Sequence, residues 1–156
     1  MASRLQSEIK QSQPFASLQE EALLNLQRTA DLLSRRGAEL LKPSKLTPTQ
    51  YNVLRILRGA GRAGRSCREI GERMIAQDPD ITRLLDRLEK RRLIARTREH
   101  RDRRVVTTRI TAAGLDLLAG LDRPLAELNR RRFPGLSSRQ LRQLIGLLEA
   151  ARGAQG

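Results

Sequence analysis

The segment from Asp78 to Thr111 constrains the fold more than any other part of the chain. Asp78-Pro79 is typical of a helix start, because an Asp side chain accepts hydrogen bonds from free N–H groups and Pro lacks an N–H there. Four apolar residues then follow with helical spacing and predict one buried stripe, namely Ile81, Leu84, Leu85 and Leu88. The opposite side of this helix carries Arg83, Asp86, Arg87 and Lys90.

Two short strands are expected after this helix, starting at Leu93–Ala95 and Val105–Thr108. The nine residues RTREHRDRR between them are too charged to bury and predict a hairpin tip. From Arg83 to Arg109 there are eleven Arg or Lys and four Asp or Glu, a net of +7 out of +14 for the whole chain. A basic helix beside a basic hairpin suits duplex DNA, with the helix in a major groove and the tip in the neighbouring minor groove. This arrangement predicts a winged helix-turn-helix.

Helix start signals divide the rest of the chain. Capping boxes at Ser17, Thr47, Ser66 and Ser137, each followed three residues later by Glu or Gln, predict helix starts, and Thr111 can cap a further helix. The helix from Ser66 is expected to use Ile70, Met74 and Ile75 as its apolar residues, and Pro124 is expected to kink or break the helix that Thr111 begins. The expected fold is mainly α with a small β-wing. Its parts are an N-terminal arm and dimerisation helix (1–44), a winged helix-turn-helix domain (45–111) and C-terminal dimerisation helices (112–156).

The terminal helices carry more apolar surface than one small winged domain needs. A shared dimer core is the favoured explanation, since proteins that read DNA grooves are commonly two-fold dimers. The alternative is that these helices only cover the domain.

Composition excludes several classes of function. Phe15, Tyr51 and Phe133 are the only aromatic residues, which argues against single-strand binding by base stacking. A membrane surface is the alternative partner that a net charge of +14 allows. However, no run of the sequence approaches the roughly 18 to 20 apolar residues that a membrane span needs, and no secretory signal is evident. The single Cys67 excludes an internal disulfide, so a cytoplasmic protein is expected. Residues 59–64 match a dinucleotide-binding glycine pattern, but a helix precedes them, which favours a basic connection between helices.

The ordered motifs LTPTQYNVLRIL, SCREIGERM, DPDITRLLDRLEKRRLI and DRRVVTTRIT resemble the MarR family of transcriptional regulators. The resemblance implies a homodimer on a near-palindromic operator in double-stranded DNA, with interlocked terminal helices and a small-molecule effector as an option. The helix matching 79–92 would be the recognition helix. Thr82 and Arg83 would then contact bases or nearby phosphates, and Arg87 would contact phosphate. Many relatives have Gly at the position of Arg92, which must adopt a left-handed conformation or end the helix differently.

In the wing, the resemblance implies that Asp102 braces an arginine that contacts DNA at the minor groove, and Arg101, Arg103 and Arg104 all stay open for that role. The candidate DNA-binding residues are Thr47, Arg68, Pro79, Asp80, Thr82, Arg83, Arg87, Lys90, Arg98, His100, Arg101, Asp102, Arg103 and Arg104.

Cys67 allows a redox-sensor hypothesis, because it lies at a helix start between Arg65 and Arg68. Packing of a small, partly buried residue is the favoured alternative. His100 has no second His or Cys near it and predicts no metal site. The expected function is a sequence-specific DNA-binding regulator, in particular a repressor. The alternatives are a non-specific architectural protein and, last, an enzyme, for which we identify no catalytic constellation, metal or cofactor site.

Overall fold

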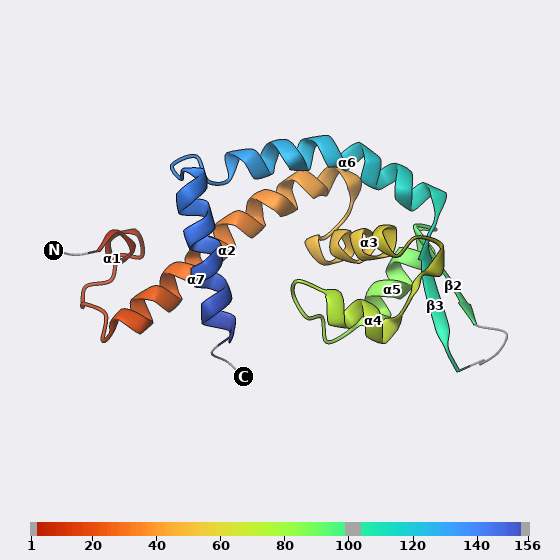
Figure 1. Cartoon of the computed structure of the whole chain (residues 1–156), viewed down its shortest axis with the longest axis horizontal. Coiled ribbons are helices and arrows are strands. Elements are labelled where there is room, and N and C mark those ends of the chain that lie inside the picture. The colour runs from red at the N-terminus through yellow and green to blue at the C-terminus, as the bar shows by residue number, and fades with distance from the viewer. Residues whose placement is uncertain (1–2, 99–103, 154–156) are drawn as a thin grey trace.

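The computed structural model describes residues 3–98 and 104–153 of the chain. Figure 1 shows a winged unit at one end of the molecule and a long helical arm extending from it. The elements in chain order are α1 (Arg4–Glu8), α2 (Leu18–Leu41), the 3-10 turn η1 (Lys42–Ser44), α3 (Pro48–Ala60), the 3-10 turn η2 (Gly61–Ala63), β1 (Arg65–Ser66), α4 (Cys67–Arg73), α5 (Ile81–Lys90), β2 (Ile94–Arg98), β3 (Val106–Ile110), α6 (Ala112–Arg131) and α7 (Ser138–Gly153). The fold is mainly α with a small sheet, as the sequence predicts.

Side-chain caps begin most of these helices. Thr47 and Ser66 each form a complete capping box, with Gln50 and Glu69 as the reciprocal partners. Hydrogen bonds from the backbone and side chain of Ser66 hold the pKa of Glu69 below its ordinary value. Thr111 caps α6, which runs through Pro124 without a break. These local signals are the reason that the predicted helix starts are nearly all correct.

The sheet has three antiparallel strands in the order β1-β3-β2. The β2–β3 hairpin is in register from Ile94 opposite Ile110 to Arg98 opposite Val106, and forms the wing. The two-residue strand β1 pairs with the other edge of β3 at Thr107 and Thr108. This strand is absent from the sequence-based prediction, because two residues carry no detectable periodicity.

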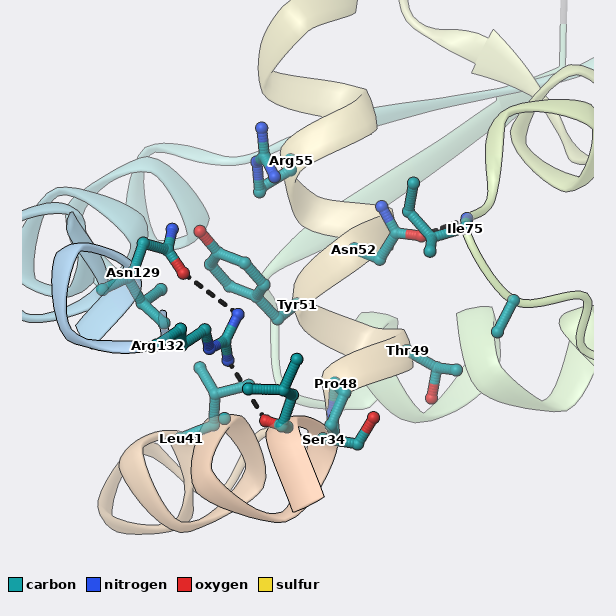
Figure 2. Close-up of a pocket in the computed structure, with 14 residues that line it drawn as sticks. Ser34, Leu41, Pro48, Thr49, Tyr51, Asn52, Arg55, Ile75, Asn129 and Arg132 are labelled. Carbon is teal, nitrogen blue, oxygen red and sulfur yellow. Dashed lines mark hydrogen bonds between the residues drawn. The ribbon is translucent and has the colours of Figure 1, made fainter. Parts of the chain in front are cut away.

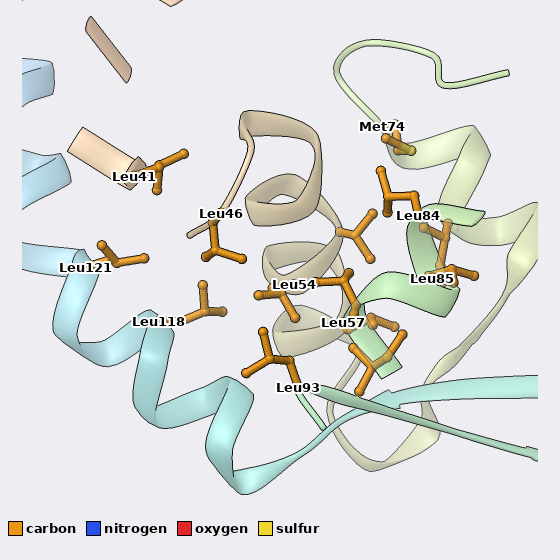
Figure 3. Close-up of a cluster of buried hydrophobic side chains, with 14 of the residues drawn as sticks. Leu41, Leu46, Leu54, Leu57, Met74, Leu84, Leu85, Leu93, Leu118 and Leu121 are labelled. Carbon is orange, nitrogen blue, oxygen red and sulfur yellow. The ribbon is translucent and has the colours of Figure 1, made fainter. Parts of the chain in front are cut away.

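One apolar core joins the winged unit to the base of the arm (Figure 3). The predicted stripe of α5 enters it through Leu84, Leu85 and Leu88, while α6 contributes Leu118 and Leu121. Full burial of a Leu side chain is worth about 1.5–3 kcal/mol, so this cluster holds α5 with one fixed side facing outward.

The prediction that α5 begins at Asp78-Pro79 is wrong, because Asp80 is the N-cap and its carboxylate accepts from the Arg83 N–H at 3.3 Å. Asp78 instead accepts from the Asp80 N–H at 2.9 Å and forms the preceding turn. Ile75 also departs from expectation. It lies beyond the end of α4, and the residue is 91% exposed.

Arg92 takes the left-handed conformation, with φ of 58°, directly after α5. The Arg92 N–H donates to the Glu89 carbonyl at 2.8 Å, and the Leu93 N–H donates to the Leu88 carbonyl at 3.1 Å. This pair of bonds is a Schellman motif, in which Gly is the usual residue. Of the two conformations that the sequence allows for Arg92, the structure therefore has the strained one.

The arm consists mainly of α2 and α6, which pack side by side (Figure 1). Large apolar side chains remain exposed on α2 and α7, including Leu23, Leu26 and Leu32 on α2 and Ile145 and Leu147 on α7. No residue of α7 is buried.

Candidate nucleic-acid interface

The outward side of α5 presents three exposed cations, Arg83, Arg87 and Lys90, with Thr82 exposed beside Arg83. Arg83 forms an ion pair with Asp80 at 3.1 Å, in which both side chains are at least half exposed. Such surface pairs contribute about 0–1 kcal/mol, so a phosphate or a base edge can replace Asp80 at little cost. The exposed face therefore offers cations and one hydroxyl to a polyanion. Pro79, in the preceding turn, is also exposed.

Arg96 joins the wing to α5. Its Nε and Nη2 atoms donate to the Glu89 carboxylate at 3.0 and 2.6 Å, its backbone N–H donates to Glu89 at 3.1 Å, and Nη2 also contacts Asp86. The Arg96 side chain is 23% exposed. These bonds hold the pKa of Glu89 below its ordinary value and raise that of Arg96.

The expectation that RTREHRDRR is wholly a solvated tip is therefore wrong at Arg96, and we did not single out Arg96 or Glu89 from the sequence. A signal was present, since Arg96 lies two residues after the buried Ile94 and strand residues at i and i+2 share a face. Asp86, predicted on the outward side with the cations, is turned to an internal partner.

The wing carries exposed cations at both described margins, with Arg98 ending β2 and Arg104 preceding β3. Arg109 of β3 is hydrogen-bonded within the winged unit, because its Nε donates to the Arg62 carbonyl of η2 at 2.8 Å. The predicted wing residues His100, Arg101, Asp102 and Arg103 lie outside the described residues.

Two further candidates lie away from α5. Thr47 is exposed, and its hydroxyl is engaged in capping α3. Arg68 is exposed on α4 and pairs with Glu72 at 2.9 Å. Next to it, Cys67 is neither fully buried nor fully exposed, and packs against the apolar core. This position agrees with the packing interpretation of Cys67, and a redox role stays a hypothesis.

A cavity of about 360 Å³ lies between the arm and the winged unit, lined by α2, α3, the turn after α4, and α6 (Figure 2). Its described lining includes Tyr51, Arg55 and Arg132 and holds no carboxylate. Arg132 donates to Asn129 Oδ1 at 3.0 Å and to the Leu33 carbonyl at 3.4 Å, while its Nε is buried with no partner among the described residues. Gly37 makes room for this guanidinium, because a Cβ there would lie 2.8 Å from Nη2. The family resemblance implies a ligand pocket between the dimerisation helices and the winged domain, but the residues that line this cavity were not predicted from the sequence.

Within residues 3–98 and 104–153, no helix is both long and apolar enough to cross a bilayer. The same residues contain no group of three or more His, Cys, Asp or Glu that could hold a metal ion.

Comparison with known proteins adds an independent line of evidence. The model of the MarR family matches residues 46–106. The chain is 35% identical over 97 residues to the HTH-type transcriptional repressor MdtR of Bacillus subtilis, a match that covers 62% of this chain and 61% of that relative's length.

Among solved structures, a MarR transcription factor from Planctomyces limnophilus is 40% identical with a TM-score of 0.67, and the alignment covers 87% of this chain and 98% of that one. A MepR–DNA complex of S. aureus shares the fold, with a TM-score of 0.76 at 19% identity over 83% of this chain and 94% of that one.

Proposed function

The chain belongs to the MarR family, and we propose that it is a homodimeric, sequence-specific repressor that binds a near-palindromic operator in double-stranded DNA. The observation that carries the proposal is the exposed face of α5, where Thr82, Arg83 and Arg87 stand on a helix whose other side is locked in the core. Residues 45–111 hold eighteen Arg or Lys against eight Asp or Glu, a net of +10 out of +14. The charge is thus concentrated in the winged unit and not spread over the arm.

In this proposal the recognition helix is α5. Thr82 and Arg83 contact base edges or adjacent phosphates, Arg87 and Lys90 contact phosphate, and Pro79 and Asp80 hold the helix start against the duplex. Thr47 and Arg68 contact the flanking DNA backbone. The wing, with Arg98, His100, Arg101, Asp102, Arg103 and Arg104 as its candidate contacts, reaches the minor groove, and Arg101, Arg103 and Arg104 all stay open as the arginine that Asp102 braces. Arg is the usual partner of guanine in a major groove, and phosphate contacts fix the register of the helix.

The arm supports the homodimer. Ile145 and Leu147 of α7 are 54% and 70% exposed, and Leu23, Leu26 and Leu32 of α2 are about half exposed. Several large apolar residues exposed on the same two helices favour a protein interface there, and a two-fold dimer would place two copies of α5 on successive half-sites. The division into an arm (1–44), a winged domain (45–111) and C-terminal helices (112–156) belongs to this proposal.

The cavity between the arm and the winged unit supports release of the operator by a small ligand. Two arginines, apolar walls and a buried N–H donor without an acceptor suit a small organic anion with an apolar body. Benzoate is a suitable probe, with benzamide as its neutral counterpart. We expect benzoate to weaken operator binding, benzamide to leave it unchanged, and Arg132→Met to abolish the benzoate effect. Equal effects of the two compounds would contradict an anion site.

The first experiment is selection from a pool of random duplexes at physiological salt, followed by sequencing of the bound fraction. Enrichment of a near-palindrome with half-sites about one helical turn apart is the expected result. Salt-sensitive binding without an enriched sequence would replace the repressor by a non-specific architectural protein, the alternative that the high net charge allows. A specific regulator typically prefers its operator by about 10³-fold or more over random DNA.

A further inference from the structure

The C-terminal end of α5 is hydrogen-bonded to the joint between α2 and α3. The guanidinium of Arg91, the C-cap residue of α5, donates from Nη1 to the Lys45 carbonyl at 2.6 Å and from Nη2 to the Ser44 carbonyl at 3.0 Å. Lys45 has a positive φ of 53°, so the chain turns sharply at this point. Arg91 thus spans from the proposed recognition helix to the place where the arm enters the winged unit.

The same end of α5 is bonded to the second connection of the arm, between β3 and α6. The Thr111 hydroxyl donates to the Arg92 carbonyl at 2.7 Å, and the Thr111 N–H donates to the Leu93 carbonyl at 3.1 Å. Because Thr111 is also the N-cap of α6, these bonds set where α6 begins. Gly114 permits this approach, since a Cβ there would lie 2.4 Å from the Leu93 oxygen.

Residues 91–93 therefore form a junction that touches both chain connections between the arm and the winged unit. The residues proposed to read bases, Thr82 and Arg83, lie at the opposite end of α5. A ten-residue helix is about 15 Å long, so a rotation of about 10° at the junction moves the far end by about 2.6 Å. That is most of the rise of one base pair, about 3.4 Å. A small change of angle at the junction thus moves the end of α5 that carries Thr82 and Arg83 by most of the rise of one base pair.

We propose that Arg91 is a positioning residue that determines the half-site spacing of the operator, by fixing the angle of α5 relative to the arm. This inference rests on the proposed function, because spacing has meaning only for a dimer on two half-sites. In such a dimer the two arms meet, and each junction sets the direction in which its recognition helix leaves the common centre. Arg91 itself contacts no base in this proposal. It acts through the carbonyls of Ser44 and Lys45.

The test uses the full chain and duplexes built from the selected operator, with the half-sites at their selected spacing, one base pair closer and one base pair farther apart, together with a single half-site duplex. Arg91→Met keeps the aliphatic stem and removes both donors. Lys45→Gln is the matched control, because it removes one positive charge at the same joint while its backbone carbonyl remains. Thr111→Val tests the second connection, and Thr111→Ser retains the hydroxyl.

We expect Arg91→Met to reduce the preference for the selected spacing by about tenfold, the effect of losing about 1.4 kcal/mol of hydrogen bonding, with less than a twofold change in Kd for the single half-site. Thr111→Val should also broaden the spacing preference, whereas Lys45→Gln and Thr111→Ser should keep that of the wild type.

Wild-type spacing preference in Arg91→Met would overturn the proposal, whatever the result for Thr111→Val. Equal losses by Arg91→Met on the single half-site and the full operator would also overturn it, because they would show that Arg91 binds phosphate directly. These results are distinct from a failure of the proposed function, which would appear in the wild type as binding without any preferred pair of half-sites.

Discussion

Replacement of Arg96 by Met tests whether the ion-pair network between β2 and α5 holds the wing in place. Met keeps most of the apolar stem of Arg96 but removes the guanidinium that contacts Glu89 and Asp86. The backbone N–H of residue 96 can still donate to Glu89, so the strand itself should form. The expected defect is therefore in the attachment of the wing and not in its folding.

The magnitude follows from exposure. A fully exposed ion pair contributes about 0–1 kcal/mol, while breaking a fully buried one costs about 3–5 kcal/mol. Arg96 is 23% exposed, but Glu89 and Asp86 are 38% and 49% exposed and can be rehydrated when the guanidinium is gone. We therefore expect a loss of about 1–2 kcal/mol in the free energy of unfolding.

Urea denaturation followed by circular dichroism measures this loss, and a double-mutant cycle with Glu89→Gln isolates the pair. Glu89→Gln should destabilise more than Asp86→Asn, because Glu89 accepts from Nε, Nη2 and the backbone N–H of Arg96, whereas Asp86 accepts from Nη2. A coupling energy below about 0.3 kcal/mol would refute the reasoning, since it would lie within the error of independent sites.

Four further predictions address pH, base reading, the wing and the Gly114 contact. The pKa of Glu89 is lowered, first by its hydrogen bonds from the Arg96 side chain. The contribution of Glu89 to stability is therefore complete above its unfolded-state pKa and is lost as pH falls through its lower folded-state pKa. In a series of urea denaturations at decreasing pH, the destabilisation by Arg96→Met should accordingly shrink. Arg83→Ala should cost about 1–3 kcal/mol on the operator and relax specificity, and equal losses on operator and random DNA would show that Arg83 touches only phosphate. Arg104→Ala should weaken binding to all duplexes and lower the salt slope by about one unit, and an unchanged slope would remove it from the phosphate contacts. Gly114→Ala should destabilise the fold, whereas Gly120→Ala should stabilise it by about 0.5–1 kcal/mol, because a Cβ at Gly120 would meet no atom within 4 Å beyond the neighbouring backbone of its own helix. Similar thermal shifts for both variants would contradict the close approach of Gly114 to Leu93.

Local signals in the sequence predict most of the fold, because the helix starts at Thr47, Ser66 and Ser137 depend on bonds within one turn of the chain. The same reasoning fails at Asp78 because two Asp residues compete to cap α5. Asp78 is the better match to a capping pattern with Pro79, but the structure uses Asp80 and gives Asp78 to the turn. Choosing between them requires knowing where α4 ends, which is a tertiary property.

The candidate site, like the fold, could be predicted only in part from the sequence. The exposed face of α5 follows from its 3.6-residue periodicity, so Arg83, Arg87 and Lys90 could be placed from the sequence alone. The partners of Arg91, Arg96 and Arg132 could not, because each binds a group that is distant along the chain or on another element. In a chain with 31 Arg or Lys, residue type does not separate structural cations from those that face a ligand.

The acidic residues of this region explain how a helix with mixed charges can present a basic face. Asp78 and Asp80 accept from backbone N–H groups at the start of α5, and Asp86 and Glu89 bind Arg96 on the side toward the wing. These four carboxylates are thus hydrogen-bonded within the fold. Of the four, only Asp80 also pairs with an outward-facing cation of α5, Arg83, and that ion pair is exposed. Negative charge is held at the start and wing side of the helix, while Arg87 and Lys90 are directed outward. The same pairs that attach the wing therefore also separate the charges, so neutralising Glu89 should perturb the position of the wing more than the affinity of α5 for phosphate.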